Sequence, residues 1–224
     1  GLNIEGSNLK GVYQAMEYLP YANRFALGEI PNSPIDVADK QVVIIGGGDT
    51  GADCLGTAHR QGAAKITQLE IMPEPTVSRS SNQPWPLYPN IFRVSSAHEE
   101  GGEREYSVNT RRFLGEAGKL TGLEVETVEF VNGKFIPVEN SLRIIPADYV
   151  FLAMGFTGPD LSWINKEVSI AQDERSNIAR DEAFQTNQEG VFVCGDAGRG
   201  QSLIVWAIAE GRSCARYVDR RAHV

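Results

Sequence analysis

Gln41-Val42-Val43-Ile44-Ile45-Gly46-Gly47-Gly48-Asp49-Thr50-Gly51 joins an apolar run to a G-x-G-x-x-G turn. Four β-branched residues in a row predict a buried strand over Gln41–Ile45. The residues after the turn predict a helix over Thr50–Gln61, which Gly62 closes. The next strand is expected over Lys65–Ile71, which completes a βαβ unit.

Glycines placed between a strand and a helix are typical of dinucleotide-binding folds, whereas the same glycines without that context mean little. Gly46 would allow the tight turn, Gly48 would let a pyrophosphate approach the backbone, and Gly51 would let the helix pack closely on the strand. The alternative is a βαβ unit whose glycines serve packing only. We expect a Rossmann-like α/β fold whose nucleotide site includes Gly46, Gly47, Gly48, Asp49, Thr50 and Gly51.

Glu70 and Arg79 are the candidates for choosing between NADH and NADPH. Glu70 lies 19 residues after Gly51, at the end of the second strand, where a carboxylate hydrogen-bonds the ribose 2′-OH and repels a 2′-phosphate. Arg79 is close enough in sequence to act as a phosphate partner instead. The sequence favours NADH, with a solvated strand-end carboxylate as the alternative role of Glu70.

A second strand-turn-helix pattern occurs near the end of the sequence. A strand is expected over Val191–Cys194, followed by Gly195-Asp196 and by a helix over 203–218 with an apolar face. Asp196 could accept a hydrogen bond from a sugar hydroxyl, and the N–H groups of Ser202 and Leu203 could face a carbonyl or phosphate. A capped helix after a strand is the alternative interpretation. The residues expected at a cofactor here are Gly195, Asp196, Gln201, Ser202 and Leu203.

The remaining segments are less regular. A short helix is expected over residues 9–19, a linker over 28–39, and a proline–aromatic loop near a cofactor or partner over 72–90. Residues 104–145 predict antiparallel strands over 105–108, 120–130 and 134–137, with turns at 118–119 and 132–133. The strand expected over 149–153 ends at Met154-Gly155, which we place beside the nicotinamide or at a hinge between domains.

Composition excludes several classes of function. The net charge is −8 without a basic cluster, which argues against nucleic-acid binding. No apolar run is long enough for a membrane span. The three cysteines are widely spaced and form no C-x-x-C, so we expect neither a metal site nor an iron–sulfur site in this chain. A reducing cytoplasm is the expected compartment.

Five stretches together resemble the glutamate synthase small (beta) subunit. They are VVIIGGGDTGADCLGTAHRQGA, PWPLYPNIFRV, REYSVNTRRFLGE, IIPADYVFLAMGFTGP and GVFVCGDAGRGQSLIVWAIAEGR, and QLEIMPEP fits one form of that subunit. The resemblance implies a flavoprotein with two dinucleotide-binding domains. It implies a connection to the FAD domain over 1–35, an NAD(P)H-binding domain over 36–154 and the C-terminal part of the FAD-binding domain over 155–224. The Gly195-Asp196 turn would then lie at the FAD ribityl chain and phosphate, with the helix near Gln201 pointing at the isoalloxazine.

The resemblance also implies an activity. The small subunit transfers a hydride from NAD(P)H to FAD, and electrons pass through iron–sulfur centres outside this chain to the glutamate-forming large subunit. The cysteines and the first FAD glycine turn of that subunit are not in this sequence, so we expect a fragment that is inactive alone. No residue is predicted to be catalytic, and His59 and His98 are expected at the surface or in packing. The alternatives are a related flavin module that feeds another acceptor, such as a ferredoxin-linked transhydrogenase or a pyrimidine reductase, and a non-catalytic dinucleotide-binding protein.

Overall fold

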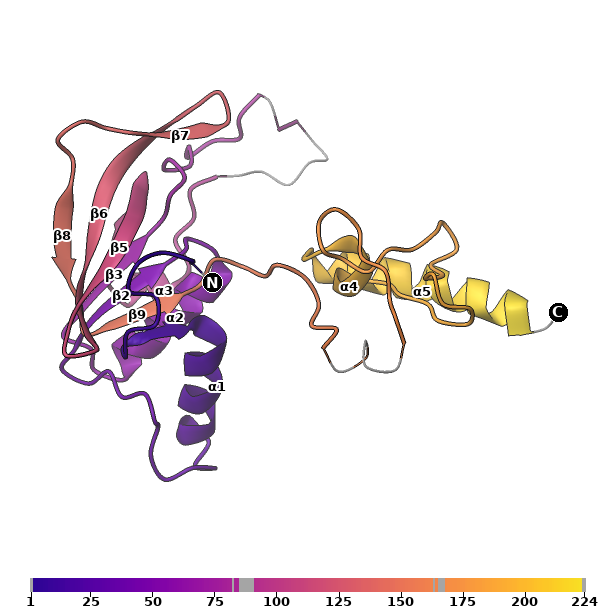
Figure 1. The fold of residues 1–224 in the computed structure, drawn as a ribbon, viewed down its shortest axis with the longest axis horizontal. Coiled ribbons are helices and arrows are strands. Elements are labelled where there is room, and N and C mark those ends of the chain that lie inside the picture. The colour runs from indigo at the N-terminus through magenta and orange to yellow at the C-terminus, as the bar shows by residue number, and fades with distance from the viewer. Residues whose placement is uncertain (1, 82, 85–90, 163, 165–167, 223–224) are drawn as a thin grey trace. The chain divides into compact units, whose positions relative to one another are not determined.

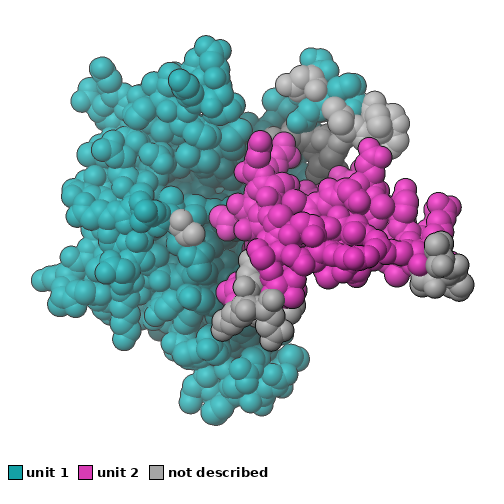
Figure 2. All heavy atoms as spheres, turned by 45° about the vertical axis from the view of Figure 1, so that its right-hand side comes forward, with its two compact units in different colours: residues 1–155 teal, residues 156–224 magenta. Residues whose placement is uncertain are grey.

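The computed structural model describes residues 2–81, 83–84, 91–162, 164 and 168–222. The chain divides into two compact units, residues 1–155 (unit 1) and residues 156–224 (unit 2), which Figure 2 distinguishes by colour. The roles of these units as NAD(P)H and FAD domains stay predictions. Residues 85–90, with the aromatic part of the expected 72–90 loop, lie outside the described residues.

Unit 1 is built on a parallel sheet (Figure 1). Every pairing between neighbouring strands of this sheet is parallel. The expected strand over Gln41–Ile45 is confirmed, and the next strand ends two residues earlier than the predicted 65–71. The strands, in their order across the sheet, are β1 (Val12–Gln14), β9 (Tyr149–Leu152), β2 (Gln41–Ile45), β3 (Lys65–Leu69) and β4 (Glu103–Glu105).

Two long helices pack with this sheet, α1 (Ala15–Ala26) and α2 (Asp49–Arg60). The crossover helix α2 agrees with the predicted 50–61 to within one residue at each end. The helix predicted over 9–19 is wrong in its limits, because residues 12–14 pair with β9 and the helix starts only at Ala15. Residues 1–35, expected as a connection to another domain, thus contribute an edge strand and a helix to unit 1.

An antiparallel layer packs with residues from the parallel sheet in the second core of unit 1. Its hairpin turns at 117–118 and 132–133 follow the glycine signals, the first one residue earlier than predicted. The single strand predicted over 105–108 is wrong, because Ser107 has a φ of 58° and separates the end of β4 from the start of the next strand. The strands are β5 (Val108–Glu116), β6 (Lys119–Val131), β7 (Lys134–Pro137) and β8 (Arg143–Pro146).

Successive side chains of β2 point into different cores of unit 1. Val42 and Ile44 belong to the core with Tyr18 of α1 and Leu55 of α2, whereas Val43 belongs to the core with the antiparallel layer. Successive residues of a strand point to opposite faces of the sheet, so an apolar run without alternation fits a strand that is covered on both sides. The strand that leads into the glycine turn is therefore held rigidly.

Unit 2 contains two helices in its described residues, α4 (Asp196–Arg199) and α5 (Ile204–Ala222). The strand predicted over Val191–Cys194 is wrong, because within the described part of the chain this segment forms only an isolated bridge between Gln185 and Phe192. A strand must pair with another strand, and the local sequence does not show whether a pairing strand is present. Across the described residues, no helix is both long and apolar enough to cross a membrane.

The apolar face predicted for α5 is not its buried face. Ile204 and Ile208 are 76% and 52% exposed, whereas Glu210 and Cys214 are buried. Apolar spacing identifies a face that favours burial, but it does not identify what packs on that face.

Candidate functional site

The turn between β2 and α2 requires glycine at two of its positions. Gly46 has a φ of 126°, and a Cβ there would lie 2.2 Å from the Ala153 carbonyl oxygen at the end of β9. A Cβ on Gly51 would lie 2.2 Å from the Gly46 carbonyl oxygen. Gly48 differs from both, because a Cβ there would meet no protein atom within 4 Å. The fold thus requires the outer glycines, and the middle one leaves open space beside the start of α2.

A pocket of about 430 Å³ lies at this turn, entirely within unit 1. Four of the predicted site residues line it, namely Gly47, Gly48, Asp49 and Glu70. Gly46, Thr50 and Gly51 belong to the turn and the start of α2 but are not among the described lining residues. The other described lining residues are Ala52, Met72, Pro73, Pro75, Ile91, Arg93, Ser95, His98, Arg104 and Tyr106.

Glu70 directly follows the carboxyl end of β3 and reaches across to the glycine turn. Its Oε2 accepts a hydrogen bond from the Gly47 N–H at 2.7 Å, and its Oε1 accepts one from the Met72 N–H at 2.9 Å. These bonds fix the carboxylate at the pocket wall. A carboxylate oxygen has more than one acceptor direction, so Glu70 retains capacity for a ligand hydroxyl.

The arginines that line the pocket are not the predicted Arg79. Arg79 donates through Nη1 to the Gln83 carbonyl oxygen at 2.9 Å and is not among the described lining residues. Arg93 and Arg104 line the pocket instead, and Arg104 donates to the Arg93 carbonyl oxygen at 2.9 Å. Sequence reasoning missed Arg104 because it reaches the site through the parallel register that places it opposite Gln68.

His98 also lines this pocket, on the short helix α3 (Ser96–Glu99). Its Nε2 lies 2.8 Å from Gln68 Oε1, and its Nδ1 lies 2.8 Å from Ser95 Oγ. Burial, followed by the nearby charge of Arg104, lowers the pKa of His98 below its usual value of 6.5. This histidine was expected at the surface or in packing, and the structure places it at the pocket.

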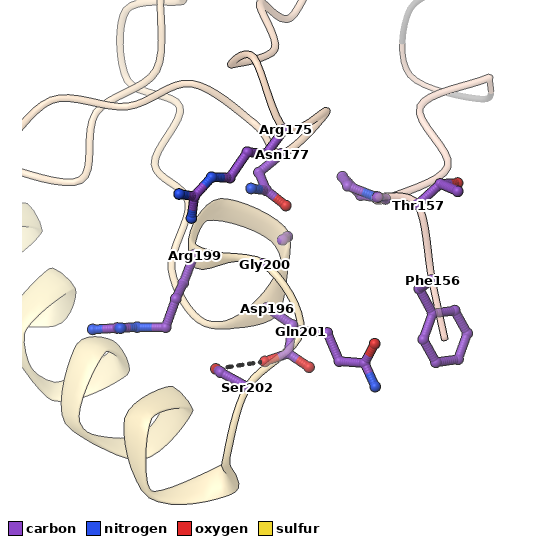
Figure 3. Close-up of a pocket in the computed structure, with 12 residues that line it drawn as sticks. Phe156, Thr157, Arg175, Asn177, Asp196, Arg199, Gly200, Gln201 and Ser202 are labelled. Carbon is purple, nitrogen blue, oxygen red and sulfur yellow. Dashed lines mark hydrogen bonds between the residues drawn. The ribbon is translucent and has the colours of Figure 1, made fainter. Parts of the chain in front are cut away.

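Unit 2 holds a second pocket, of about 660 Å³ (Figure 3). Three residues expected at a cofactor, Asp196, Gln201 and Ser202, line this pocket, and Ser202 Oγ lies 3.2 Å from Asp196 Oδ1. Gly195 and Leu203 are adjacent in sequence but are not among its described lining residues. Arg175 and Arg199 line this pocket, and their guanidinium groups make it suitable for an anionic ligand. The other described lining residues are Phe156, Thr157, Gly158, Pro159, Asn177, Ala197 and Gly200.

A buried carboxylate supports this second pocket from α5. Glu210 is 8% exposed and accepts two hydrogen bonds from Arg180, both at 2.9 Å. It also accepts one from Arg199 Nε at 2.7 Å and one from the Gly195 N–H at 2.9 Å. The Arg180 bonds are the main cause that lowers the pKa of Glu210 to about 2. Sequence reasoning missed Glu210 because its partners lie far from it in the chain.

Met154 and Gly155 follow β9, and neither is among the described residues that line the two pockets. Met154 is 45% exposed, and Gly155 has a φ of 82°. Their predicted position beside the nicotinamide stays a prediction. In the described part of the chain, no group of three or more His, Cys, Asp or Glu residues could hold a metal ion.

The chain is 54% identical over 224 residues to a glutamate synthase [NADPH] small chain from Mycobacterium tuberculosis. The chain is thus similar in sequence to a glutamate synthase small chain. It spans 98% of its own length in this alignment and 46% of that relative, so it corresponds to about half of the longer protein. Residues 110–211 match the pyridine nucleotide-disulphide oxidoreductase family.

Further relatives differ in the nicotinamide that their names give. A glutamate synthase [NADH] from Schizosaccharomyces pombe is 40% identical and aligns with 97% of this chain and 11% of that relative. The sequence resemblance to the glutamate synthase small subunit is confirmed by these alignments.

Solved structures confirm the fold class. FprA from Mycobacterium tuberculosis in complex with NADPH superposes with a TM-score of 0.70 at 13% identity, covering 100% of this chain and 61% of FprA. Thioredoxin reductase from T. acidophilum gives a TM-score of 0.64 at 20% identity, covering 100% of this chain and 62% of the reductase. At these identities the likeness establishes the α/β Rossmann-like fold alone.

Proposed function

We propose that unit 1 binds NAD(P)H with its pyrophosphate on the Gly46–Gly51 turn. The observation that carries this proposal is the contrast within the turn. Gly46 and Gly51 are needed by the fold, whereas a Cβ on Gly48 would enter only open space beside the pocket. A glycine that the protein itself does not need is explained by a ligand that approaches the backbone. The start of α2 supplies N–H groups and a favourable dipole for phosphate oxygens.

The position of Glu70 supports NADH as the preferred nicotinamide. Its carboxylate is anchored at the pocket wall by two backbone N–H groups, where it would accept a hydrogen bond from an adenosine ribose hydroxyl. The same charge would repel a 2′-phosphate. Binding of NADPH would instead draw on the lining cations Arg93 and Arg104.

Unit 2 would contribute to an FAD site. Asp196 and Ser202 would face the ribityl hydroxyls, and Arg175 and Arg199 would face phosphate oxygens, because all four line one pocket. The arginine Arg199 is fixed there by Glu210 and by the ring of Trp206, which lies 4.4 Å from its guanidinium carbon. A bound flavin supplies the conversion of two-electron hydride chemistry into single-electron transfer.

For the whole protein we propose the electron-input role of a glutamate synthase small subunit in the cytoplasm. Hydride transfer from NAD(P)H to FAD would deliver electrons, through iron–sulfur centres outside this chain, to a glutamate-forming large subunit. The identity of 54% over 224 residues to a glutamate synthase small chain supports this proposal. The protein's own contribution would be to bind and orient both cofactors, so no side chain of this chain needs to act as an acid or base in the hydride step.

Calorimetric titration with NADH and NADPH tests the nucleotide site in this chain. We expect tighter binding of NADH, and about tenfold weaker NADH binding in Glu70→Ala. The matched variant Glu70→Gln keeps a hydrogen-bond acceptor but removes the charge, so NADPH binding should strengthen. Tighter NADPH binding in the unmodified chain, lost in Arg104→Gln, would contradict the NADH preference. Absence of binding by either nucleotide would contradict the site itself.

A test of the electron-input role requires the natural protein that carries this sequence, purified with its flavin. Anaerobic mixing with NADH should bleach the oxidised flavin, and added glutamate synthase large subunit, supplied with glutamine and 2-oxoglutarate as the electron-accepting substrates, should restore flavin absorbance as glutamate forms. Bleaching with no glutamate formation would direct the search to another electron acceptor. Failure to bleach with either nicotinamide would contradict the oxidoreductase assignment.

A further inference from the structure

One peptide group of the glycine turn is held at both of its polar atoms by residues from β3 and its end. The Gly46 carbonyl oxygen accepts a hydrogen bond from Gln68 Nε2 at 2.8 Å, and the Gly47 N–H donates to Glu70 Oε2 at 2.7 Å. These atoms belong to the single peptide bond between Gly46 and Gly47. Gly47 has no side chain and lies at the surface, so these two bonds determine which way the peptide plane faces.

Gln68 is itself fixed by His98. Gln68 is 2% exposed, and its Oε1 lies 2.8 Å from His98 Nε2. Because a buried amide makes only the bonds that its surroundings allow, the contact with His98 determines which end of the Gln68 amide faces Gly46. With the oxygen toward His98, the amide NH₂ group must face the Gly46 carbonyl.

The proton on His98 follows from the bonds around it. The Ser95 N–H can only donate, and it points at His98 Nδ1 over 3.4 Å, with Ser95 Oγ at 2.8 Å. Nδ1 is therefore an acceptor, which leaves the proton of the neutral imidazole on Nε2, where it donates to Gln68. The lowered pKa of His98 agrees with this neutral form.

The helix that carries His98 is anchored away from the turn. Ala97 packs against Gly56 of α2, where an added Cβ would come within 3.0 Å of the Ala97 Cβ. Glu100, which follows α3, forms an ion pair with Arg60, and its carbonyl oxygen contacts His59. His98 thus extends from a helix that is anchored on the C-terminal half of α2.

We propose that Gln68 and His98 are positioning residues that orient the Gly46–Gly47 peptide for binding of a dinucleotide pyrophosphate. Neither residue needs to touch the phosphates for this role. The chain of bonds runs from the Ser95 N–H through His98 and Gln68 to the Gly46 carbonyl, and it sets the direction of the N–H groups that follow. The role in ligand binding rests on the proposed nucleotide site, whereas the orientation of the peptide can be measured without a ligand.

Two substitutions at His98 test its bond to Gln68 separately from its contact with Ser95. His98→Gln retains a donor near the Nε2 position, whereas His98→Asn can place an acceptor near the Nδ1 position but is too short to place its NH₂ donor near the Nε2 position. We expect His98→Asn to speed hydrogen exchange of the Gly47 amide about tenfold, with His98→Gln close to the unmodified chain. Equal exchange rates in both variants and the unmodified chain would overturn the inference, even if the chain bound no nucleotide.

Ligand titrations then test the link to the pyrophosphate. His98→Asn should weaken NADH and ADP-ribose about tenfold and change adenosine, which has no phosphate, by less than about twofold. Gln68→Met, which removes both amide groups at similar volume, should give the same pattern. Equal losses for adenosine and ADP-ribose would indicate general damage to the pocket and would overturn the proposed role. Loss of NADH binding in His98→Gln to the extent seen in His98→Asn would also overturn it.

Discussion

Replacement of Gly51 by alanine tests the packing of the glycine turn, because it either lowers or raises the free energy of unfolding of unit 1. Gly51 lies in the first turn of α2, where alanine favours the helix over glycine by about 1 kcal/mol. The added Cβ would lie 2.2 Å from the Gly46 carbonyl oxygen and 2.5 Å from Gln68 Nε2. Cβ contacts under 3.0 Å are essentially never seen, so the turn must move by about 0.8 Å, the difference between 3.0 and 2.2 Å.

Overpacking of a tight contact costs about 1–3 kcal/mol, which exceeds or matches the helix gain. We expect Gly51→Ala to lower the free energy of unfolding of unit 1 by up to about 2 kcal/mol, the overpacking cost less the helix gain. The same movement displaces the Gly46–Gly47 peptide, so NADH affinity should fall about tenfold or more.

Urea unfolding, followed through the amide signals of unit 1 for this variant and of unit 2 for its control, measures these changes. Gly211→Ala in α5 is the matched control, because its added Cβ would meet no atom within 4 Å, and it should stabilise its helix by about 1 kcal/mol. The packing argument is refuted if Gly51→Ala stabilises unit 1 as Gly211→Ala stabilises unit 2.

Three further predictions concern single side chains. Gly48→Ala should leave the free energy of unfolding of unit 1 within about 1 kcal/mol of the unmodified chain, because its Cβ meets only open space. The same Cβ would occupy space proposed for the pyrophosphate, so NADH binding in a titration should weaken about tenfold. Glu210, whose pKa is lowered from 4.5 to about 2, should stabilise unit 2 above pH 4.5 and lose that contribution as the pH falls toward 2; a urea midpoint equally pH-dependent in Glu210→Gln would contradict this. His98 resists protonation in the folded state, so unit 1 should lose stability as the pH falls below 6.5, a slope that His98→Gln should remove from its urea midpoints.

Local sequence was sufficient to predict the strand β2, the glycine turn after it and the helix α2. The run Val42–Ile45 is apolar without alternation, which fits a strand buried on both faces, and the glycines mark a turn that side chains would block. The hairpin at Asn132-Gly133 was predictable for a related reason, because that dipeptide favours a left-handed backbone, and both residues have a positive φ.

Features that depend on distant partners were not predictable in the same way. His98 and Arg104 reach the pocket through α3 and through the pairing of β4 with β3, and no local pattern indicates that register. Glu210 bonds to Arg180, which is 30 residues away in the chain. The predicted strand over Val191–Cys194 was wrong, and the apolar face of α5 is not its buried face, because local patterns describe a preference for partners without specifying them.

The most direct test of nucleotide binding at the Gly46–Gly51 turn is a map of backbone amide chemical shifts in this chain during titration with NADH. We expect the largest changes at Gly47, Gly48 and Asp49 and near Glu70, where the pocket meets the start of α2. We also expect Gly48→Ala to reduce those changes greatly at the same NADH concentration. Saturating shifts confined to other residues, with the Gly46–Gly51 turn unaffected, would contradict the claim that this turn binds the nucleotide.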